Sequence, residues 1–88
     1  MRFRDATEAD LAAVVALLAD DPLGATRESP GAELPPAYAE AFAAIAADPN
    51  NRLIVADDEG AVVGCLQLTF IPGLTYTGGW RAQIEGVR

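Results

Sequence analysis

The sequence contains no histidine, no lysine and only one cysteine, Cys65. A zinc site of the Cys/His type needs several such ligands, so no metal site is expected. A lone cysteine also excludes an intrachain disulfide and favours a reducing compartment. Because no histidine could activate its thiol, and because it lies within an apolar stretch, we interpret Cys65 as a packing residue rather than a nucleophile.

Basic residues are scarce as well. Six arginines stand against 13 acidic residues, which gives a formal net charge of −7 and an isoelectric point near 4.2. Binding to a phosphate backbone requires clustered positive charge, so we expect no nucleic-acid partner. The negative charge could attract a cationic small molecule, although acidity more often serves solubility.

No apolar run approaches the ~20 residues that span a bilayer. The N-terminal stretch MRFRDATEAD is too charged for a signal peptide, which predicts a cytoplasmic location without membrane association. The 88 residues allow one small domain, and a 51% hydrophobic content with a mean hydropathy of +0.18 excludes a disordered chain. This is more apolar surface than two helices and a few strands can bury.

Local patterns predict a strand through Phe3, followed by a helix that begins at Thr7. Asp10 lies three residues after Thr7, as in a capping box, and Pro22 ends the helix at or before Asp21. An apolar stripe at helical spacing is formed by Leu11, Val14, Val15 and Leu18.

Residues 21–34, DPLGATRESPGAEL, are rich in turn formers and charge, which predicts a loop longer than the usual connection of ~4–6 residues. Pro35 and Pro36 can then open a second helix, which ends around residues 48–51. The apolar face of this helix is formed by Tyr38, Phe42 and Ile45.

The stretch RLIVADDEGAVVGCLQLTF predicts an antiparallel hairpin, with strands at Leu53–Ala56 and Val62–Phe70 around a polar turn that contains Gly60. Both faces of the second strand are largely apolar and should be covered. They consist of Val63, Cys65 and Ile71 on one side and of Val62, Leu66, Leu68 and Phe70 on the other. After Pro72-Gly73 and a short connection, a last strand runs from Trp80 to the end of the sequence.

These elements follow one another as β-α-α-β-β-β. The order predicts an α/β (α+β) fold, a mostly antiparallel sheet with two helices on one face and the strand around Glu85 at an open edge. Two consecutive helices most simply cover one face of a sheet. We therefore expect no segment of this sequence to cover the other face of the sheet.

The element order, the hairpin LIVADDEGAVVGCLQL and the acid-bearing last strand AQIEGVR resemble the N-terminal half of the GNAT superfamily of acetyltransferases, over the whole chain (1–88). In that family, the strand that matches Trp80–Arg88 leads into a glycine-rich turn, of the form R-x-x-G-x-G or Q-x-x-G-x-A. The amides of this turn hold the pyrophosphate of acetyl-CoA at a helix N-terminus, which suits a diphosphate. The sequence ends where the turn would begin, so the resemblance implies a partial GNAT domain.

The resemblance assigns the catalytic role to Glu85, because a carboxylate at the rim of the sheet could accept the proton that an acceptor ammonium must lose. The alternative is a solvated strand carboxylate, or one paired with Arg81. Gly86, Val87 and Arg88 would bind acetyl-CoA through their backbone, since this strand end splays from its neighbour in the family. For an isolated chain, a fraying terminus is the alternative.

Residues 23–34 match the acceptor-side loop of the family, so Arg27 and Glu28 could recognise a charged substrate. A solvated surface loop is the alternative. Tyr76 could protonate a leaving thiolate, although the usual acid of the family lies beyond the matching half. Trp80 is expected to pack at the start of its strand rather than to form a binding platform.

The resemblance implies an N-acetyltransferase that moves acetyl from acetyl-CoA to an amine of a small molecule or peptide, with this chain an incomplete portion. The alternatives are an interaction or assembly module and a non-functional truncation product. The isolated chain is expected to be inactive and to bind acetyl-CoA poorly, because it lacks the pyrophosphate turn and is acidic. Its terminal strand, Trp80–Arg88, is expected to lack a neighbour and to be held by a second copy or by the missing C-terminal half.

Overall fold

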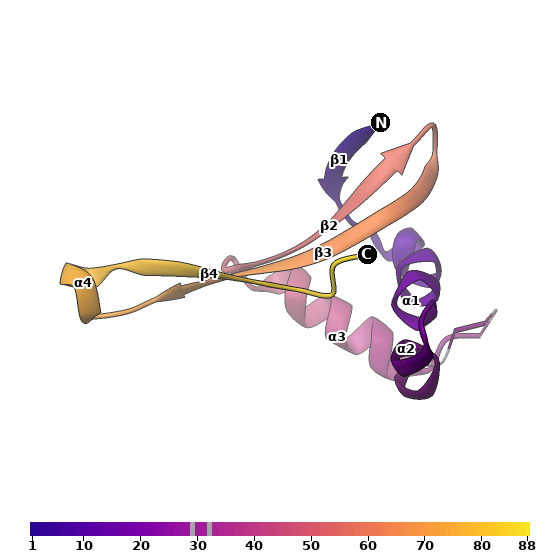
Figure 1. Cartoon of the computed structure of the whole chain (residues 1–88), viewed down its shortest axis with the longest axis horizontal. Coiled ribbons are helices and arrows are strands. Elements are labelled where there is room, and N and C mark those ends of the chain that lie inside the picture. Colours follow the sequence, from indigo (N-terminus) through magenta and orange to yellow (C-terminus); the bar gives the residue numbers. More distant parts are fainter. Residues whose placement is uncertain (29, 32) are drawn as a thin grey trace.

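Within the described residues, four antiparallel strands in the order β1-β2-β3-β4 form one sheet (Figure 1). The structure is a computed structural model that describes residues 1–28, 30–31 and 33–88. The elements are β1 (Arg2–Asp5), a 3₁₀ turn η1 (Glu8–Asp10), α1 (Leu11–Ala19), α2 (Pro22–Arg27), α3 (Pro36–Ala47), β2 (Asn51–Asp58), β3 (Ala61–Pro72), α4 (Thr75–Gly78) and β4 (Trp80–Glu85). None of the described helices is long and apolar enough to cross a membrane.

The predicted helix start after Thr7 is a 3₁₀ turn, η1, and the α-helix α1 follows it at Leu11. The Asp10 carboxylate accepts a hydrogen bond from the Thr7 amide at 2.7 Å, the reciprocal bond of a capping box. The same carboxylate accepts two bonds from the Arg4 guanidinium, at 2.7 and 3.1 Å. Arg4 also donates to Asp57 at 3.0 Å. This network joins β1, the start of α1 and the end of β2, and both carboxylates in it are buried.

The core lies between α1 and the middle of β2 and β3. Its buried centre is Val14, Val55 and Cys65, against which Leu17, Leu18, Leu53 and Val62 pack. The predicted faces of β3 are wrong at one point, because Val62 rather than Val63 faces this core. The cause is an irregularity in the register between Ala56 and Asp57, which pair with Gly64 and Val62 and leave Val63 unpaired and half exposed.

The predicted hairpin is confirmed, with longer strands than expected. Asp58 pairs with Ala61, so the loop is only Glu59 and Gly60, both at positive φ (53° and 90°). Two positive φ angles are typical of the tight turn that matches the twist of a hairpin. The Asp57 carboxylate closes the turn by accepting a hydrogen bond from the Gly60 amide at 2.8 Å.

The predicted loop over residues 21–34 is wrong in its first half, which forms the helix α2. Asp21 is the N-cap, since its carboxylate accepts a bond from the Gly24 amide, and Pro22 occupies the first helical position. The proline that ends α1 therefore also starts the next helix. Ser29 and Ala32 of the predicted loop lie outside the described residues.

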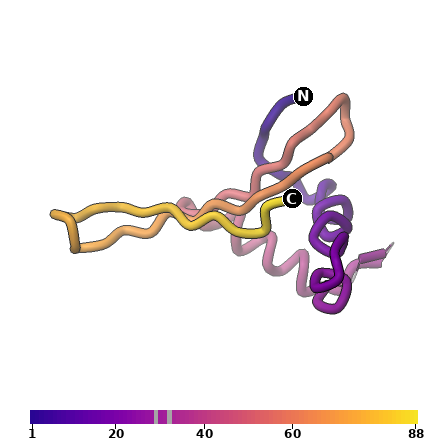
Figure 2. The backbone as a smooth tube through the Cα atoms, in the orientation of Figure 1, coloured from indigo at the N-terminus to yellow at the C-terminus, as the bar shows by residue number. Residues whose placement is uncertain are grey.

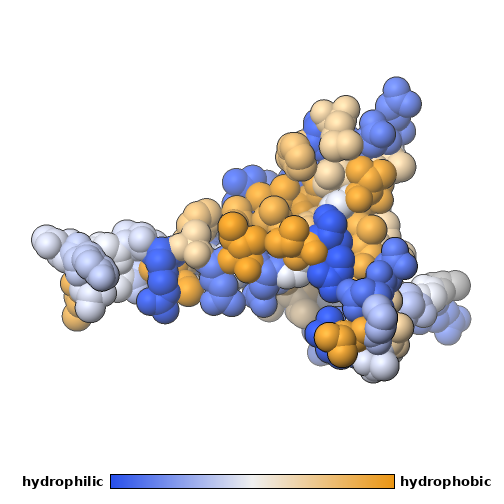
Figure 3. All heavy atoms as spheres, viewed as in Figure 1, coloured by the Kyte–Doolittle hydropathy of each residue, from blue (hydrophilic) through white to orange (hydrophobic). Residues whose placement is uncertain are grey.

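The second predicted helix is confirmed as α3, and its stripe of Tyr38, Phe42 and Ile45 is half-buried. Figure 1 shows α1 and α3 on the same side of the sheet. The opposite face carries apolar side chains that no described helix covers. Alternation from the register places on it Phe3, Ile54, Leu66 and Ile84, and Phe3 and Ile84 are 75% and 59% exposed. Apolar atoms gather over this part of the sheet in Figure 3.

The last strand differs from the prediction, because it has a neighbour. All six residues of β4 pair with β3, from Gln67↔Glu85 to Pro72↔Trp80. The two strands project from the body as an arm that ends in α4, where Tyr76 and Thr77 have left-handed backbone angles (Figure 2). Within the described residues, the outer edge of β4 is open. Trp80 is 62% exposed on this arm, so the expectation that it packs at the start of its strand is wrong.

Candidate functional site

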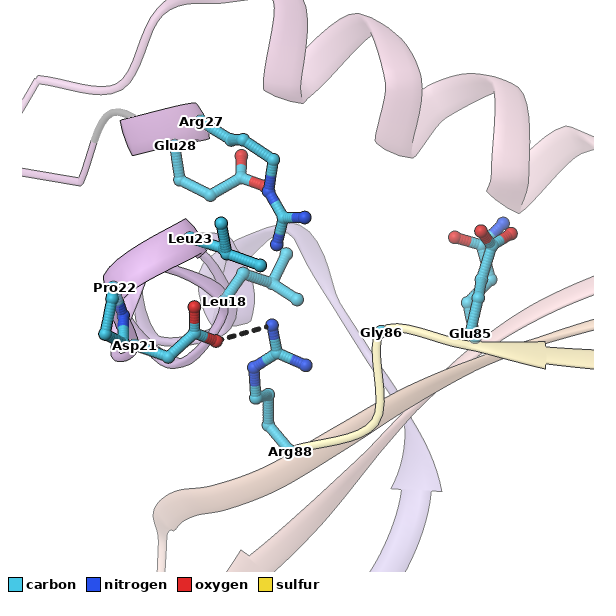
Figure 4. A pocket seen from close by; sticks show the side chains of 10 residues that line it. Leu18, Asp21, Pro22, Leu23, Arg27, Glu28, Glu85, Gly86 and Arg88 are labelled. Carbon is cyan, nitrogen blue, oxygen red and sulfur yellow. Dashed lines mark hydrogen bonds and ion pairs between the residues drawn. The ribbon is translucent and has the colours of Figure 1, made fainter. Parts of the chain in front are cut away.

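An open hollow of about 850 Å³ lies between α2 and the end of β4 (Figure 4). Its charged lining comes from Asp21, Arg27, Glu28, Glu85 and Arg88, and Leu18, Leu23 and Gln67 contribute to its walls. Asp21 and Arg88, which are 67 positions apart in the chain, thus meet at one site. The fold brings together five of the six site residues predicted from sequence, and the sixth, Val87, borders a separate apolar hollow that opens on the other face of the sheet.

Glu85 is positioned by the sheet. It ends β4 opposite Gln67, and its side chain leaves the sheet on the side where the helices lie (Figure 4). Its carboxylate forms no hydrogen bond or ion pair with any described residue, and neither does the guanidinium of Arg81. The alternative of a pair between these two residues is therefore not present. An exposed carboxylate without a partner is available to accept a proton or to bind a cation.

The backbone beyond Glu85 bends away from β3 and returns. Gly86 has φ 61°, and the Arg88 amide then donates to the Cys65 carbonyl at 2.9 Å while the Arg88 carbonyl accepts from the Cys65 amide at 3.1 Å. Because Gln67 pairs with Glu85, two residues, Gly86 and Val87, lie opposite one, as in a β-bulge. Their amides have no hydrogen-bond partner in the described part of the chain. Arg88, in contrast, uses both of its backbone groups within the sheet.

Asp21 connects α2 to this segment. One oxygen of its carboxylate caps α2, and the other accepts from the Arg88 guanidinium at 3.0 Å. The Gly24 amide, followed by the nearby charge of Arg88, lowers the pKa of Asp21 below its usual range. Gly24 packs α2 closely on the end of α1, because a Cβ at this position would lie 2.0 Å from the Leu18 carbonyl oxygen. Sequence reasoning missed Asp21, although an aspartate directly before a proline is itself a helix-start signal.

Arg27 and Glu28 lie at the end of α2. The Glu28 carboxylate accepts a hydrogen bond from the Tyr38 hydroxyl at 2.7 Å, which anchors it to α3. The Arg27 side chain is exposed and reaches over the hollow (Figure 4). It forms no ion pair or hydrogen bond within the described residues.

Cys65 lies beneath the bulge and is buried, with its Sγ 3.5 Å from the Gly86 carbonyl oxygen. Burial raises the pKa of its thiol, which keeps it protonated and unreactive at neutral pH. Within the described ranges, no group of three or more acidic or cysteine side chains is arranged to hold a metal ion. Tyr76, 96% exposed in α4, lies at the tip of the arm, away from the hollow.

No protein-family model matches the sequence, and no curated protein matches it significantly. Among solved structures, it is similar to a crystal structure of a transcriptional regulator from Bacillus halodurans C-125, with 54% identity and a TM-score of 0.94 over 99% of this chain and 58% of the other. A putative acetyltransferase from Agrobacterium tumefaciens str. C58 is 29% identical, with a TM-score of 0.78 over 99% and 57%. Glucosamine-6-phosphate N-acetyltransferase from Arabidopsis thaliana, 16% identical, shares the fold with a TM-score of 0.74 over 98% and 57%.

These matches confirm the fold class predicted from the element order and the hairpin. Each of them extends over nearly the whole of this chain but over little more than half of the other protein. The chain therefore has the GNAT-type acetyltransferase fold and spans somewhat more than half the length of the solved structures that it matches.

Proposed function

We propose that this chain is the acceptor-side part of an N-acetyltransferase that transfers an acetyl group from acetyl-CoA to a primary amine. One observation carries the proposal. The unpartnered carboxylate of Glu85, the free amide of Gly86 and the charged end of α2 line one open hollow at the end of β4, and the free amide of Val87 follows in the same bulge. Acyl transfer to an amine needs a proton acceptor, backbone donors for the developing oxyanion and a place for the acceptor.

Glu85 would accept the proton that the acceptor must lose, directly or through a water molecule. An ammonium has no lone pair, so the nitrogen can attack a carbonyl carbon only after this proton has moved. Glu85 is suited to the role because it is exposed to the hollow and no described side chain neutralises it. The new bond joins nitrogen to the acetyl carbon, and the bond that breaks joins that carbon to sulfur.

The residues near Glu85 fit the acyl end of acetyl-CoA. Acetyl-CoA, when bound, supplies the acetyl group as a thioester. The amides of Gly86 and Val87 have no internal partner, so they can donate to the carbonyl oxygen or to the amide-rich arm of the co-substrate. The described residues hold no cluster of basic side chains that would bind its phosphates, and with a net charge of −7 we expect weak binding and no turnover by this segment alone.

The exposed apolar face of the sheet, opposite the helices, indicates that the chain has a protein partner. It includes a small hollow of about 210 Å³ between the side chains of Phe3, Ile54, Leu66 and Val87. Exposed apolar surface of this kind usually marks an interface. We infer that another polypeptide covers it, either a second copy of this chain or polypeptide of the kind that the similar structures contain beyond the matched part.

A role in transcription, as stated for the Bacillus halodurans protein, finds less support in this chain. Its 13 acidic and six basic residues give a net charge of −7, which disfavours binding to a phosphate backbone. The residues that gather at the hollow, in contrast, have the chemistry that acyl transfer needs. We therefore favour the enzymatic role.

An acetyl-transfer assay tests the proposal. The protein is expressed from its complete coding region, and release of the CoA thiol is followed with a thiol reagent against a panel of small amines and N-terminal peptides. We expect amine-dependent release with at least one acceptor. Binding of acetyl-CoA without transfer to any amine would overturn the catalytic proposal and favour a sensor. Calorimetry with the 88-residue chain checks the second part, since micromolar binding would contradict the expected weak affinity.

A further inference from the structure

The charged groups of the hollow are not equally occupied. Asp21 and Arg88 neutralise one another at 3.0 Å, and the Tyr38 hydroxyl binds Glu28. Glu85 and Arg27 are left, one on the β4 wall and one on the α2 wall. Neither has an ion pair or a hydrogen bond within the described residues. The hollow thus presents one unpaired negative and one unpaired positive group to whatever enters it.

We infer that the acceptor is a small primary amine that also carries an anionic group, a carboxylate or a phosphate. The inference rests on the proposed function and names the substrate class of the same site. The ammonium would lie at Glu85, where it can lose its proton, and the anion would lie at Arg27. A guanidinium binds carboxylates and phosphates through paired hydrogen bonds, so it selects for such a group.

An acceptor with a single charge would satisfy only one wall. A simple amine leaves Arg27 without a partner, and a diamine places a second cation near it. An acceptor that pairs with both walls gains a charge-assisted bond at each end, and discrimination of this type is large when a polar group of the site would otherwise stay unpaired. The hollow, at about 850 Å³, has room for a molecule of this size.

The other charges around the hollow do not reverse this expectation. Arg27 lies near enough to Asp21 to contribute to the lowering of its pKa, but both Asp21 oxygens are already used by Gly24 and Arg88. The Glu28 carboxylate lies on the same wall as Arg27 and keeps its negative charge, because a hydroxyl donor does not neutralise it. Its bond to the Tyr38 hydroxyl anchors it to α3, and no ion pair joins it to Arg27 within the described residues. It leaves the positive group of that wall available to an anion.

The experiment compares short primary amines that differ mainly in the group at their other end. The protein from the complete coding region is assayed with ethanolamine (neutral), putrescine (a second cation), β-alanine (a carboxylate) and O-phosphoethanolamine (a phosphate). We expect kcat/KM to be at least about tenfold higher for one of the two anionic amines than for ethanolamine, since one charge-assisted bond is worth about that factor. Whichever anionic amine has the higher kcat/KM shows whether the site prefers a carboxylate or a phosphate.

Three variants assign the effect. Arg27→Gln should remove the preference for the anionic amine, mainly through KM, and Arg27→Glu should favour putrescine. Arg2→Gln, at an exposed arginine on β1 that does not line the hollow, should leave the preference unchanged. Equal use of ethanolamine and both anionic amines, or an unchanged preference in Arg27→Gln, would overturn the inference while leaving acetyl transfer intact.

A binding measurement separates the two proposals. Calorimetry or NMR titration with β-alanine and O-phosphoethanolamine, without acetyl-CoA, reports on the hollow alone. Binding that Arg27→Gln abolishes supports the charge-paired site even if no acetyl transfer is found, in which case only the proposed function fails. If acetyl is transferred to amines but neither anionic amine shows binding that depends on Arg27, the proposed function holds and the inferred substrate class fails.

Discussion

The Arg88 guanidinium lies 3.0 Å from the Asp21 carboxylate, although the two residues are 67 positions apart in the chain. Asp21 caps α2, and Arg88 closes the bulge beyond β4 through its backbone bonds to Cys65. The ion pair therefore connects the two walls of the hollow. Its side chains are only about a third exposed, at 27% and 36%.

We expect Arg88→Gln to loosen α2 without unfolding the domain. The substitution removes the ion pair but keeps the backbone bonds of residue 88 and the cap made by Asp21. Hydrogen exchange in residues 22–27 should become faster, whereas exchange in β2 should not change. Arg52→Gln, which breaks an exposed pair with Asp5, is the matched control and should leave α2 unaffected. Equal exchange in both variants would show that the pair does not hold α2.

Glu85→Gln should lower kcat/KM for acetyl transfer by about 10²–10⁴-fold, the usual contribution of a general base. The thermal midpoint should stay the same, because the Glu85 side chain is exposed and has no partner among the described residues. The loss should appear in kcat rather than in KM, because the proton is accepted in the chemical step. In the double variant Glu85→Gln/Gln83→Glu, the carboxylate is moved to the next residue on the same face of β4. This double variant should not regain activity. Retained activity in Glu85→Gln would rule out the base.

Stability at acidic pH should depend on the Arg4 network. The hydrogen bonds from Arg4 hold the pKa of Asp10 well below its usual range, and those from Thr7 add to this against the opposing effect of burial. A depressed pKa stabilises the folded state above the ordinary carboxyl value of about 3.9 and loses this contribution as the pH falls toward the folded pKa. We expect the urea midpoint to fall steadily from about pH 5 downward.

Arg4→Gln tests this explanation. It should lower the urea midpoint at pH 7, because two buried carboxylates lose their partner, and it should flatten the decline below about pH 5. Arg52→Gln, at the exposed pair with Asp5, should have a much smaller effect at pH 7. An acid response that is the same in Arg4→Gln and in the unmodified chain would assign it to other carboxylates.

Gly24→Ala should destabilise the chain by about 1–3 kcal/mol, the usual cost of forcing a methyl group into a packed site. The new Cβ would lie 2.0 Å from the Leu18 carbonyl oxygen, so α2 has to move away from α1. Urea denaturation measures the loss, and increased hydrogen exchange in residues 22–27 locates it. Because α2 forms one wall of the hollow, KM for the acceptor should rise. A gain in stability, as expected for Gly→Ala in an uncrowded helix, would contradict the packing.

Self-association of the 88-residue chain should depend on the apolar face. Ile84→Lys places a charge on this face, where Ile84 is 59% exposed, and should shift any dimer seen by light scattering toward the monomer. Gln83→Lys is the matched control, because the neighbouring residue of β4 points to the opposite face. If the wild-type chain is already monomeric at high concentration, a second copy of the chain does not cover the apolar face.

Much of the fold could be read from local patterns. The capping pair Thr7 and Asp10, the proline at position 36 and the hairpin around Gly60 act within a few residues, so their effect is visible in the sequence. The helix α2 was missed because its composition is typical of a loop. Its cap by Asp21 and its close packing on α1 stabilise it nevertheless.

The sequence by itself determined the two longer helices, the strands, the acidic charge and an apolar content too large for two helices to cover, because these depend on composition and on contacts between near neighbours. Only the tertiary structure decided that β4 pairs with β3, that Val62 rather than Val63 faces the core, and that Arg27 and Glu85 border one hollow. Strand register and the meeting of distant side chains depend on bonds such as those of Arg88 to Cys65 and Asp21, which no local pattern encodes.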